Sequence, residues 1–315
     1  MSIKIYYEDY EAGYMLGDIF DSKFLKKLDS LCLECKKTYG GVRKGNYEAA
    51  NKKGTSIEFA DYQEYMPGDD FRYIDWNIYG RLDKLLVKTF KEEEELSVHI
   101  LFDVSRSMLY PEEDKKFDYA KDLVIALSYI ALSSKNSVRL ATMVNTDKIS
   151  QNRTPFFQQE ENIFVIADFL KKLVPKGELD FIDYISKYIH EVKGRRGTVI
   201  VISDFMMKPE IYTKGFNYLR FKNFDIKVIQ ILGETELDPF GKKSKNQVID
   251  VETNQKMNIN FSEANRKKYK AAMEEHNQRL SRFCRINRIV YSLAKTNIKF
   301  EDFILRELPR IGFVR

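Results

Sequence analysis

Cysteine and histidine are scarce in this chain, which has three of each among its 315 residues. Three cysteines in a chain of this length do not support a disulfide framework, so we expect a reducing compartment, the cytoplasm. No stretch reaches the roughly 20 apolar residues that a membrane-spanning helix needs. The N-terminal segment MSIKIYYEDYEAGYM lacks the basic head and apolar run of a signal peptide. We therefore expect a soluble cytoplasmic protein with no membrane partner.

The sequence signatures of common enzymes are also missing. The chain has no G-x-x-x-x-G-K-[ST] loop for nucleotide phosphates and no G-x-S-x-G nucleophile elbow. A magnesium-dependent phosphatase of the haloacid dehalogenase type needs a second aspartate two residues after the first. After Asp103 that position is occupied by Ser105, which cannot act as a general acid. We therefore expect a binding protein rather than an enzyme, with a metal-dependent hydrolase acting on phosphate or peptide as the alternative.

Neither sign of charge is in large excess. Lys and Arg together number 52, Asp and Glu number 47, and the net charge is +5, which does not require a nucleic-acid partner. Four arginines recur every three residues near the C-terminus: Arg279, Arg282, Arg285 and Arg288. They form either a docking stripe for an acidic partner or nucleic acid, or a solvated helix face. We favour the solvated face, and nucleic-acid binding through this basic helix remains a further alternative.

Apolar segments and amphipathic segments alternate from residue 97 onward. The predicted strands span 97–103, 137–145, 197–205, 225–232 and 288–294. The predicted helices span 116–134, 161–173, 182–192, 210–221, 261–284 and 300–308. Short, continuously apolar strands that alternate with helices predict an α/β fold with a doubly wound, mostly parallel sheet covered on both faces.

The region before residue 96 has a different character. Residues 18–38 predict an amphipathic helix, and residues 39–95 hold glycines, many aromatics and the single tryptophan. We divide the chain into residues 1–95, an N-terminal helix with a strand-rich region, and residues 96–315, the α/β domain. A hairpin insertion is expected near residues 245–260 of that domain.

Two predicted strands end in an aspartate. Asp103 closes the first strand and begins the pattern D-x-S-x-S with Ser105 and Ser107, and Asp204 follows residues 199–203 of a later strand. The carboxyl ends of parallel strands meet at one edge of the sheet, where ligands bind. Carboxylates and hydroxyls are hard ligands that suit magnesium, manganese or calcium. The alternative is that Asp103 and the serines cap the following helix.

The strings DVSRSM at 103–108 and VISDF at 201–205 resemble the metal-ion-dependent adhesion site of von Willebrand factor A domains. The preceding segment resembles the signature of a bacterial family of uncharacterised A-domain proteins that are encoded beside MoxR-type AAA+ ATPases. The signature residues are Tyr65, Pro67, Gly68, Asp69, Asp70, Arg72, Ile74, Asp75, Trp76 and Arg81. The resemblance covers residues 40–310.

This resemblance implies a doubly wound A domain that holds Mg²⁺, or Mn²⁺ or Ca²⁺ in its place. Ser105 and Ser107 would be direct ligands, with Asp103 and Asp204 close to the metal or bound to it through water. The resemblance also implies a protein partner whose Glu or Asp carboxylate completes the metal shell. A MoxR-type ATPase is the expected partner, for which the chain would act as an adaptor or co-chaperone.

The middle loop PKGELDF departs from the family pattern. The family's site takes a threonine from this loop, and Leu179 stands in that position here. Glu178 or Asp180 is left as the substitute ligand. Because magnesium demands near-ideal octahedral geometry, we expect the metal to bind weakly when no partner is present.

The signature block itself has two interpretations. In the first, Asp69 or Asp70 caps a short helix, and Trp76 packs where the N-terminal region meets the A domain. In the second, Arg72 and Arg81 contact a partner. We favour the structural interpretation, because a single tryptophan is usually a packing anchor.

Overall fold

The chain divides into two compact units in the computed structural model. The structure describes residues 22–33, 58–69, 71–91, 96–145, 152–192, 195–238, 247–249, 256–258 and 262–315. Residues 1–36 and 96–315 form one unit, here the α/β unit, and residues 37–95 form the other, here the signature unit.

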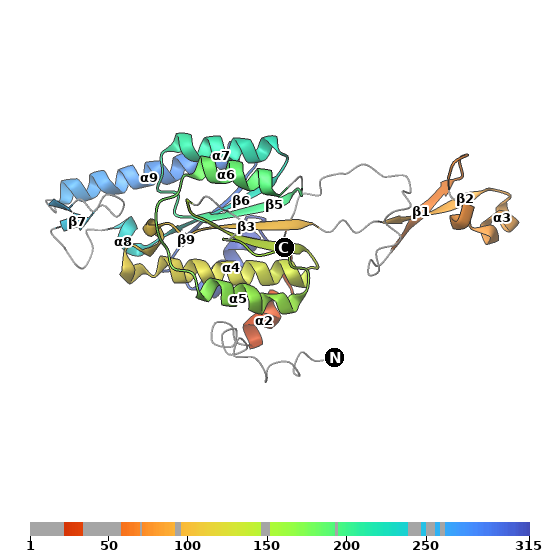
Figure 1. Cartoon of the computed structure of the whole chain (residues 1–315), viewed down its shortest axis with the longest axis horizontal. Coiled ribbons are helices and arrows are strands. Elements are labelled where there is room, and N and C mark those ends of the chain that lie inside the picture. Colours follow the sequence, from red (N-terminus) through yellow and green to blue (C-terminus); the bar gives the residue numbers. More distant parts are fainter. Residues whose placement is uncertain are drawn as a thin grey trace. The chain divides into compact units, whose positions relative to one another are not determined.

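A five-stranded sheet lies at the centre of the α/β unit (Figure 1). In spatial order its strands are β4 (Ser137–Met143), β3 (Ser97–Asp103), β5 (Gly197–Ser203), β6 (Asp225–Leu232) and β9 (Val290–Lys295). Every neighbouring pair is parallel. The chain begins in the interior of the sheet, moves to one edge and then crosses back to build the other side, which makes the sheet doubly wound. The predicted α/β class is confirmed.

Alternate residues of each strand face opposite helical layers. Ile100 and Phe102 lie in one core, which includes side chains of α4 (Lys116–Ser133) and α5 (Ile163–Lys171). Leu101 lies in the other, with α6 (Phe181–Glu191), α7 (Pro209–Phe221) and α9 (Glu263–Ile286). Figure 1 shows the two layers on either side of the sheet. Because both faces are covered, the strands are apolar without a polar alternation, as the sequence predicts.

The N-terminal helix belongs to the α/β unit, whereas the predicted boundary at residue 95 grouped it with the strand-rich region. Helix α2 (Ser22–Leu28) buries Phe24 and Leu28 in the core shared with α4, and the Phe24 ring lies 5.8 Å from that of Phe300. The helix also ends at Leu28, earlier than the predicted residue 38. Of the remaining predicted helix, residues 18–21 and 34–38 lie outside the described residues.

Three further segments complete the unit. Residues 152–157 run antiparallel to β4 and bond to it, for example through Phe157 N to Val138 O at 2.8 Å, so they cover one edge of the sheet. Strands β7 (Gln247–Ile249) and β8 (Lys256–Asn258) pair antiparallel in the segment for which the sequence predicts a hairpin.

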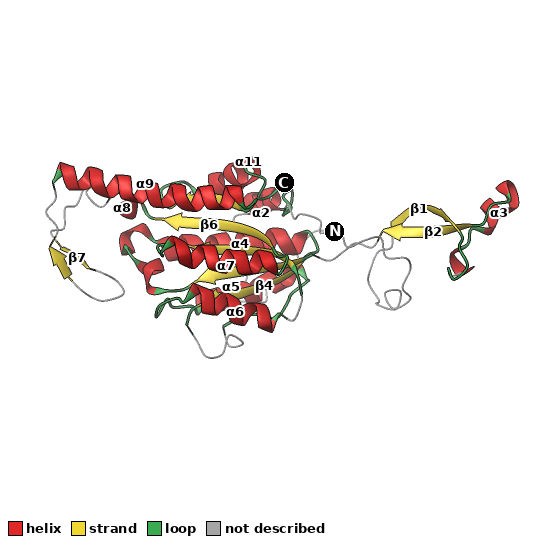
Figure 2. Cartoon of the chain, turned by 90° about the horizontal axis from the view of Figure 1, so that it is seen from above, coloured by secondary structure: helices red, strands yellow, loops and turns green. Residues whose placement is uncertain are grey.

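The chain closes with α10 (Phe300–Asp302), a π-helical turn at Phe303–Glu307 and α11 (Leu308–Arg310). Figures 1 and 2 both show α9 extending beyond the sheet on the side of α8 (Glu234–Leu237).

The signature unit is small. Strands β1 (Glu58–Glu64) and β2 (Leu86–Lys91) pair antiparallel, and α3 (Trp76–Leu82) lies between them in sequence. Asp75 begins α3, where its side chain accepts hydrogen bonds from Asn77 N and Ile78 N and pairs with Lys88 at 2.9 Å. This capping role explains the aspartate of the isoleucine-aspartate-tryptophan string.

Within the signature unit the Trp76 side chain is 61% exposed and meets the Tyr79 ring edge-on at 6.2 Å, so the packing of Trp76 against the A domain stays a prediction. The expected cap at Asp69 differs from the structure. Asp69 accepts a hydrogen bond from Met66 N and so closes a turn instead of capping a helix. Asp70 lies outside the described residues.

Candidate metal site at the strand ends

The predicted site residues come together where the direction of winding reverses. Asp103 ends β3 and Asp204 follows β5, and these two strands are neighbours in the sheet. The chain leaves them toward opposite sides, so the loops diverge and leave a crevice beyond their carboxyl ends. Asp103 and Asp204 therefore lie at the place where doubly wound folds bind their ligands.

Asp103 is a buried carboxylate with both oxygens engaged. Its Oδ1 accepts a hydrogen bond from Ser105 N at 2.9 Å, and its Oδ2 accepts one from Ser203 Oγ at 2.6 Å. Burial, followed by the negative charge of Asp204, raises the pKa of Asp103 to about 6. These two carboxylates therefore repel each other in a place from which water is excluded, and a cation would relieve that repulsion.

Asp204 is buried as well and is paired with a lysine. Its Oδ1 accepts a hydrogen bond from Met206 N at 3.1 Å, and its Oδ2 lies 3.3 Å from Nζ of Lys116. Lys116 is fully buried, and its Nζ also lies 2.6 Å from Oε1 of Glu236. Burial raises the pKa of Glu236 above its ordinary value in spite of this contact. The carboxyl groups of Asp204 and Glu236 thus share one ammonium group.

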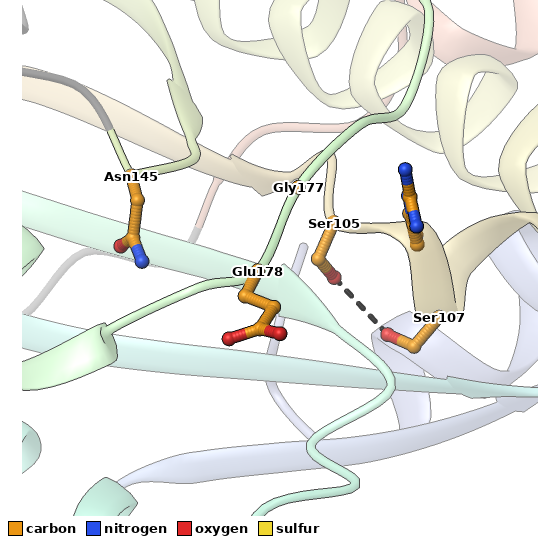
Figure 3. A pocket seen from close by; sticks show the side chains of 6 residues that line it. Ser105, Ser107, Asn145, Gly177 and Glu178 are labelled. Carbon is orange, nitrogen blue, oxygen red and sulfur yellow. Dashed lines mark hydrogen bonds between the residues drawn. The ribbon is translucent and has the colours of Figure 1, made fainter. Parts of the chain in front are cut away.

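The two serine hydroxyls lie side by side. Ser105 Oγ is 3.0 Å from Ser107 Oγ (Figure 3). Magnesium ligands stand about 2.0–2.1 Å from the ion, so two adjacent ligands of an octahedron are about 2.9 Å apart. The two hydroxyls hydrogen-bond to each other at this distance, which is also the spacing of two adjacent ligands of such an ion. Ser105 precedes the turn Arg106–Leu109 without a capping hydrogen bond from its side chain, so the capping alternative is wrong for this serine.

The hydroxyls open into a cavity of about 400 Å³. Its lining consists of Ser105, Arg106, Ser107, Asn145, Gly177 and Glu178. Figure 3 shows the carboxylate of Glu178 in the same space as the two hydroxyls. Backbone bonds from Arg106 N to Gly177 O and from Lys176 N to Val104 O hold the middle loop over the strand end. Gly177 has a φ of +74°, which glycine adopts without strain.

The middle loop places its three candidate residues differently. Leu179 is partly buried and packs against the core under α6. Asp180 is the N-cap of α6, where its side chain accepts a hydrogen bond from Asp183 N at 3.0 Å. Glu178 alone of the three lines the cavity. The cavity thus offers a divalent cation two hydroxyls and the Glu178 carboxylate, hard oxygen ligands that suit Mg²⁺ or Mn²⁺, and Asp103 and Asp204 are buried at the adjoining strand ends.

Sequence reasoning missed four residues of this region: Lys116, Asn145, Ser203 and Glu236. Asn145 and Ser203 stand at strand ends, so the rule that found Asp103 could have found them. Lys116 and Glu236 carry no such mark, because a charged residue at the start of a helix or in a turn is ordinarily solvated. Arg72 and Arg81 belong to the signature unit, and both are exposed there.

Across residues 22–315 with the gaps given above, no helix is long and apolar enough to cross a bilayer. In the same ranges, no group of three or more His, Cys, Asp or Glu side chains is arranged to hold a metal. The site described here is of another kind, since two of its oxygens come from serines.

Residues 61–279 match the family described as "Protein of unknown function DUF58". The chain belongs to the DUF58 family. Its curated relatives include uncharacterized proteins of Mycobacterium tuberculosis and Mycobacterium bovis, each 25% identical over 193 residues. That alignment covers 60% of this DUF58 chain and 60% of each relative, so the chain spans less than two thirds of their length.

Solved structures similar to this DUF58 chain include von Willebrand A proteins. BatB of Bacteroides thetaiotaomicron, a conserved hypothetical protein, is 13% identical with a TM-score of 0.43, over 69% of this chain and 98% of that one. A von Willebrand factor type A protein of Catenulispora acidiphila is 11% identical with a TM-score of 0.35, over 72% and 43%.

Proposed function

We propose that the α/β unit is a metal-dependent protein-interaction module. Ser105 and Ser107 would hold Mg²⁺ or Mn²⁺ directly, with Asp103 and Asp204 close to it or bound through water. The observation that carries the proposal is the pair of hydroxyls 3.0 Å apart, which follow a strand whose last residue, Asp103, is a buried aspartate. When bound, the metal offers an open coordination position to an anionic oxygen.

A carboxylate from a partner protein suits that position. The cavity of about 400 Å³ admits a side chain but is small for a large substrate. Its lining offers hydroxyls, an amide, a carboxylate and the Arg106 backbone and side chain. With Ser105 in the place of a general acid, we propose recognition of a partner's Glu or Asp without chemical turnover.

The proposed partner is a MoxR-type AAA+ ATPase, for which the chain serves as adaptor or co-chaperone in the cytoplasm. This part of the proposal rests on the signature resemblance. It is supported by the exposed aromatic side chains Phe71 and Trp76, which belong to the same unit as the exposed Arg72 and Arg81. Tryptophan, tyrosine and arginine are the residues most often found at binding hot spots.

Capture of a purified MoxR-type ATPase of the same organism tests the proposal. We expect capture by the full chain in Mn²⁺ and none in EDTA. Asp103→Ala and the double variant Ser105→Ala/Ser107→Ala should lose the Mn²⁺-dependent capture. Ser134→Ala is the matched control, because its hydroxyl bonds only its own helix at the other end of α4. Equal capture by all variants at equal folded fraction, or turnover of a phosphate ester that depends on Asp103, would contradict the proposal.

A further inference from the structure

Lys116 is an unusual first residue for a helix, because its side chain is completely buried. An ammonium group is costly to remove from water unless charged partners surround it. Here Nζ contacts Oδ2 of Asp204 at 3.3 Å and Oε1 of Glu236 at 2.6 Å. One of these partners belongs to the candidate metal site, and the other comes from the turn after β6.

The turn that carries Glu236 is anchored so that it cannot move away from Lys116 easily. Oε2 of Glu236 accepts a hydrogen bond from Gly233 N at 2.9 Å, and its carbonyl oxygen accepts one from the Tyr269 hydroxyl at 2.7 Å. The Asp114 carboxylate, two residues before Lys116, accepts hydrogen bonds from the backbone and hydroxyl of Thr235. A side chain at Gly233 would place a Cβ 2.0 Å from Asp114 Oδ2, so the close approach needs glycine.

We propose that Lys116 is a positioning residue that acts as the permanent cation of the site. Its positive charge lowers the affinity of the site for a divalent metal. The same charge keeps the metal-loaded site electrically neutral, so that the site does not repel a partner's carboxylate. This inference rests on the proposed function. It adds a residue of this chain that sets the balance between metal affinity and partner affinity.

The charges of the cluster give the direction of both effects. With Asp103, Asp204, Glu178 and Glu236 ionised, the cations Lys116 and Arg106 leave a net charge of two negatives, which a divalent cation cancels. Without the ammonium group the cluster would carry three negatives. It would then attract the cation more strongly, and the loaded site would remain negative and repel an incoming carboxylate. At separations of a few ångströms within a protein, one unit of charge changes a binding constant by roughly tenfold or more.

Calorimetry with Mn²⁺ on the full chain, without any partner, tests the inference. Lys116→Met should bind Mn²⁺ roughly tenfold more tightly than the wild type. Glu236→Gln should bind it more weakly, because Lys116 then pairs with Asp204 alone. The control Lys121→Met, a helix-surface residue paired with Asp118, should leave the affinity unchanged. In the capture assay, Lys116→Met should lose partner binding in spite of its fuller metal site.

Opposite shifts in the two variants separate this role from a structural one, since simple damage to the site would weaken both. Shifts in the same direction, with the far-ultraviolet circular dichroism spectrum unchanged, would overturn the inference and leave the proposed function standing. If Lys116→Met does not fold, Glu236→Gln decides alone, and tighter Mn²⁺ binding by it would overturn the inference. Absence of Mn²⁺ binding in the wild type and every variant would overturn both.

Discussion

The two units differ in how their apolar residues are used. In the α/β unit, side chains such as Ile100, Leu101 and Phe102 are fully buried on alternate faces of one sheet. In the signature unit, Ile74 is the one apolar side chain buried among those that the structure describes, whereas Phe71 and Trp76 are 67% and 61% exposed. A two-stranded sheet with so little core is at best marginally stable. Packing therefore accounts for the sequence of the first unit, whereas it does not account for the exposed Phe71 and Trp76 of the second.

Matched phenylalanine truncations give the largest expected difference. Phe102 is fully buried and stacks on Phe117 with ring centroids 5.2 Å apart, so Phe102→Ala should lower the free energy of unfolding of the α/β unit by about 3–5 kcal/mol. Phe71→Ala should change stability by no more than about 0.5 kcal/mol. Urea titration followed by circular dichroism measures the first unit, and fluorescence of Trp76, the single tryptophan, follows the second. Equal losses of stability in the two variants would show that the two units do not differ in how far they depend on buried aromatic side chains.

Asp103→Asn should stabilise the metal-free protein at pH 7, by about 1–3 kcal/mol. The pKa of Asp103 is raised to about 6 in the folded state. The folded state therefore holds the proton more tightly than the unfolded state does. This stabilising contribution is complete below the ordinary pKa and is lost as the pH rises through about 6. Melting temperatures in EDTA between pH 4 and 7 should fall less steeply for Asp103→Asn than for the wild type.

The difference between variant and wild type is the quantity to measure, because His99 acts with the opposite sign. Burial, followed by Arg139 and Arg195, lowers the pKa of His99 to about 3. Its stabilising contribution is present above the ordinary pKa of 6.5 and is lost as the pH falls toward 3. If the melting temperature changes equally with pH in Asp103→Asn and in the wild type, the pKa of Asp103 is not raised in the folded state.

Trp76→Ala should weaken capture of the ATPase by more than about 1 kcal/mol and leave the melting temperature of the α/β unit unchanged. The reason is that a large exposed ring makes few contacts within its own unit. Phe221→Ala is the matched control, an aromatic residue 76% exposed at the end of α7. If both variants lose capture equally, exposure alone does not distinguish the signature unit from the rest of the surface.

A smaller effect is expected inside the middle loop. Glu178→Gln should weaken Mn²⁺ binding by a few fold, because it removes a charge that faces the hydroxyls across the cavity. Asp180→Asn should have no effect on the metal, and it should preserve α6 because asparagine is as good an N-cap as aspartate. Calorimetry on the two variants decides which residue stands in for the missing threonine. A loss confined to Asp180→Asn would reverse the assignment made from the cavity.

Sequence reasoning performed well where a local pattern carries the information. Apolar runs with charged or glycine-containing ends located β5 and β6 almost to the residue, and their alternation with helices predicted a parallel sheet. Asp103 and Asp204 followed directly, since strands that run the same way must end at the same edge. The pattern could not show that α2 would pack on the α/β unit or that residues 152–157 would cover β4. Both are contacts between segments whose own sequences are compatible with several partners.

The chain by itself thus determined the class of fold, the edge of the sheet at which Asp103 and Asp204 stand and the serine oxygens that follow Asp103, because each depends on residues close together in sequence. Tertiary structure alone decided the charge of the site. Lys116 lies in a run of charged residues that predicts a solvated helix start. Its partners Asp204 and Glu236 are 88 and 120 residues away. The ammonium group is enclosed because β5 lies next to β3, which brings Asp204 to Lys116, and because the turn after β6 brings Glu236. A fully buried charge is stable only where such distant partners meet it.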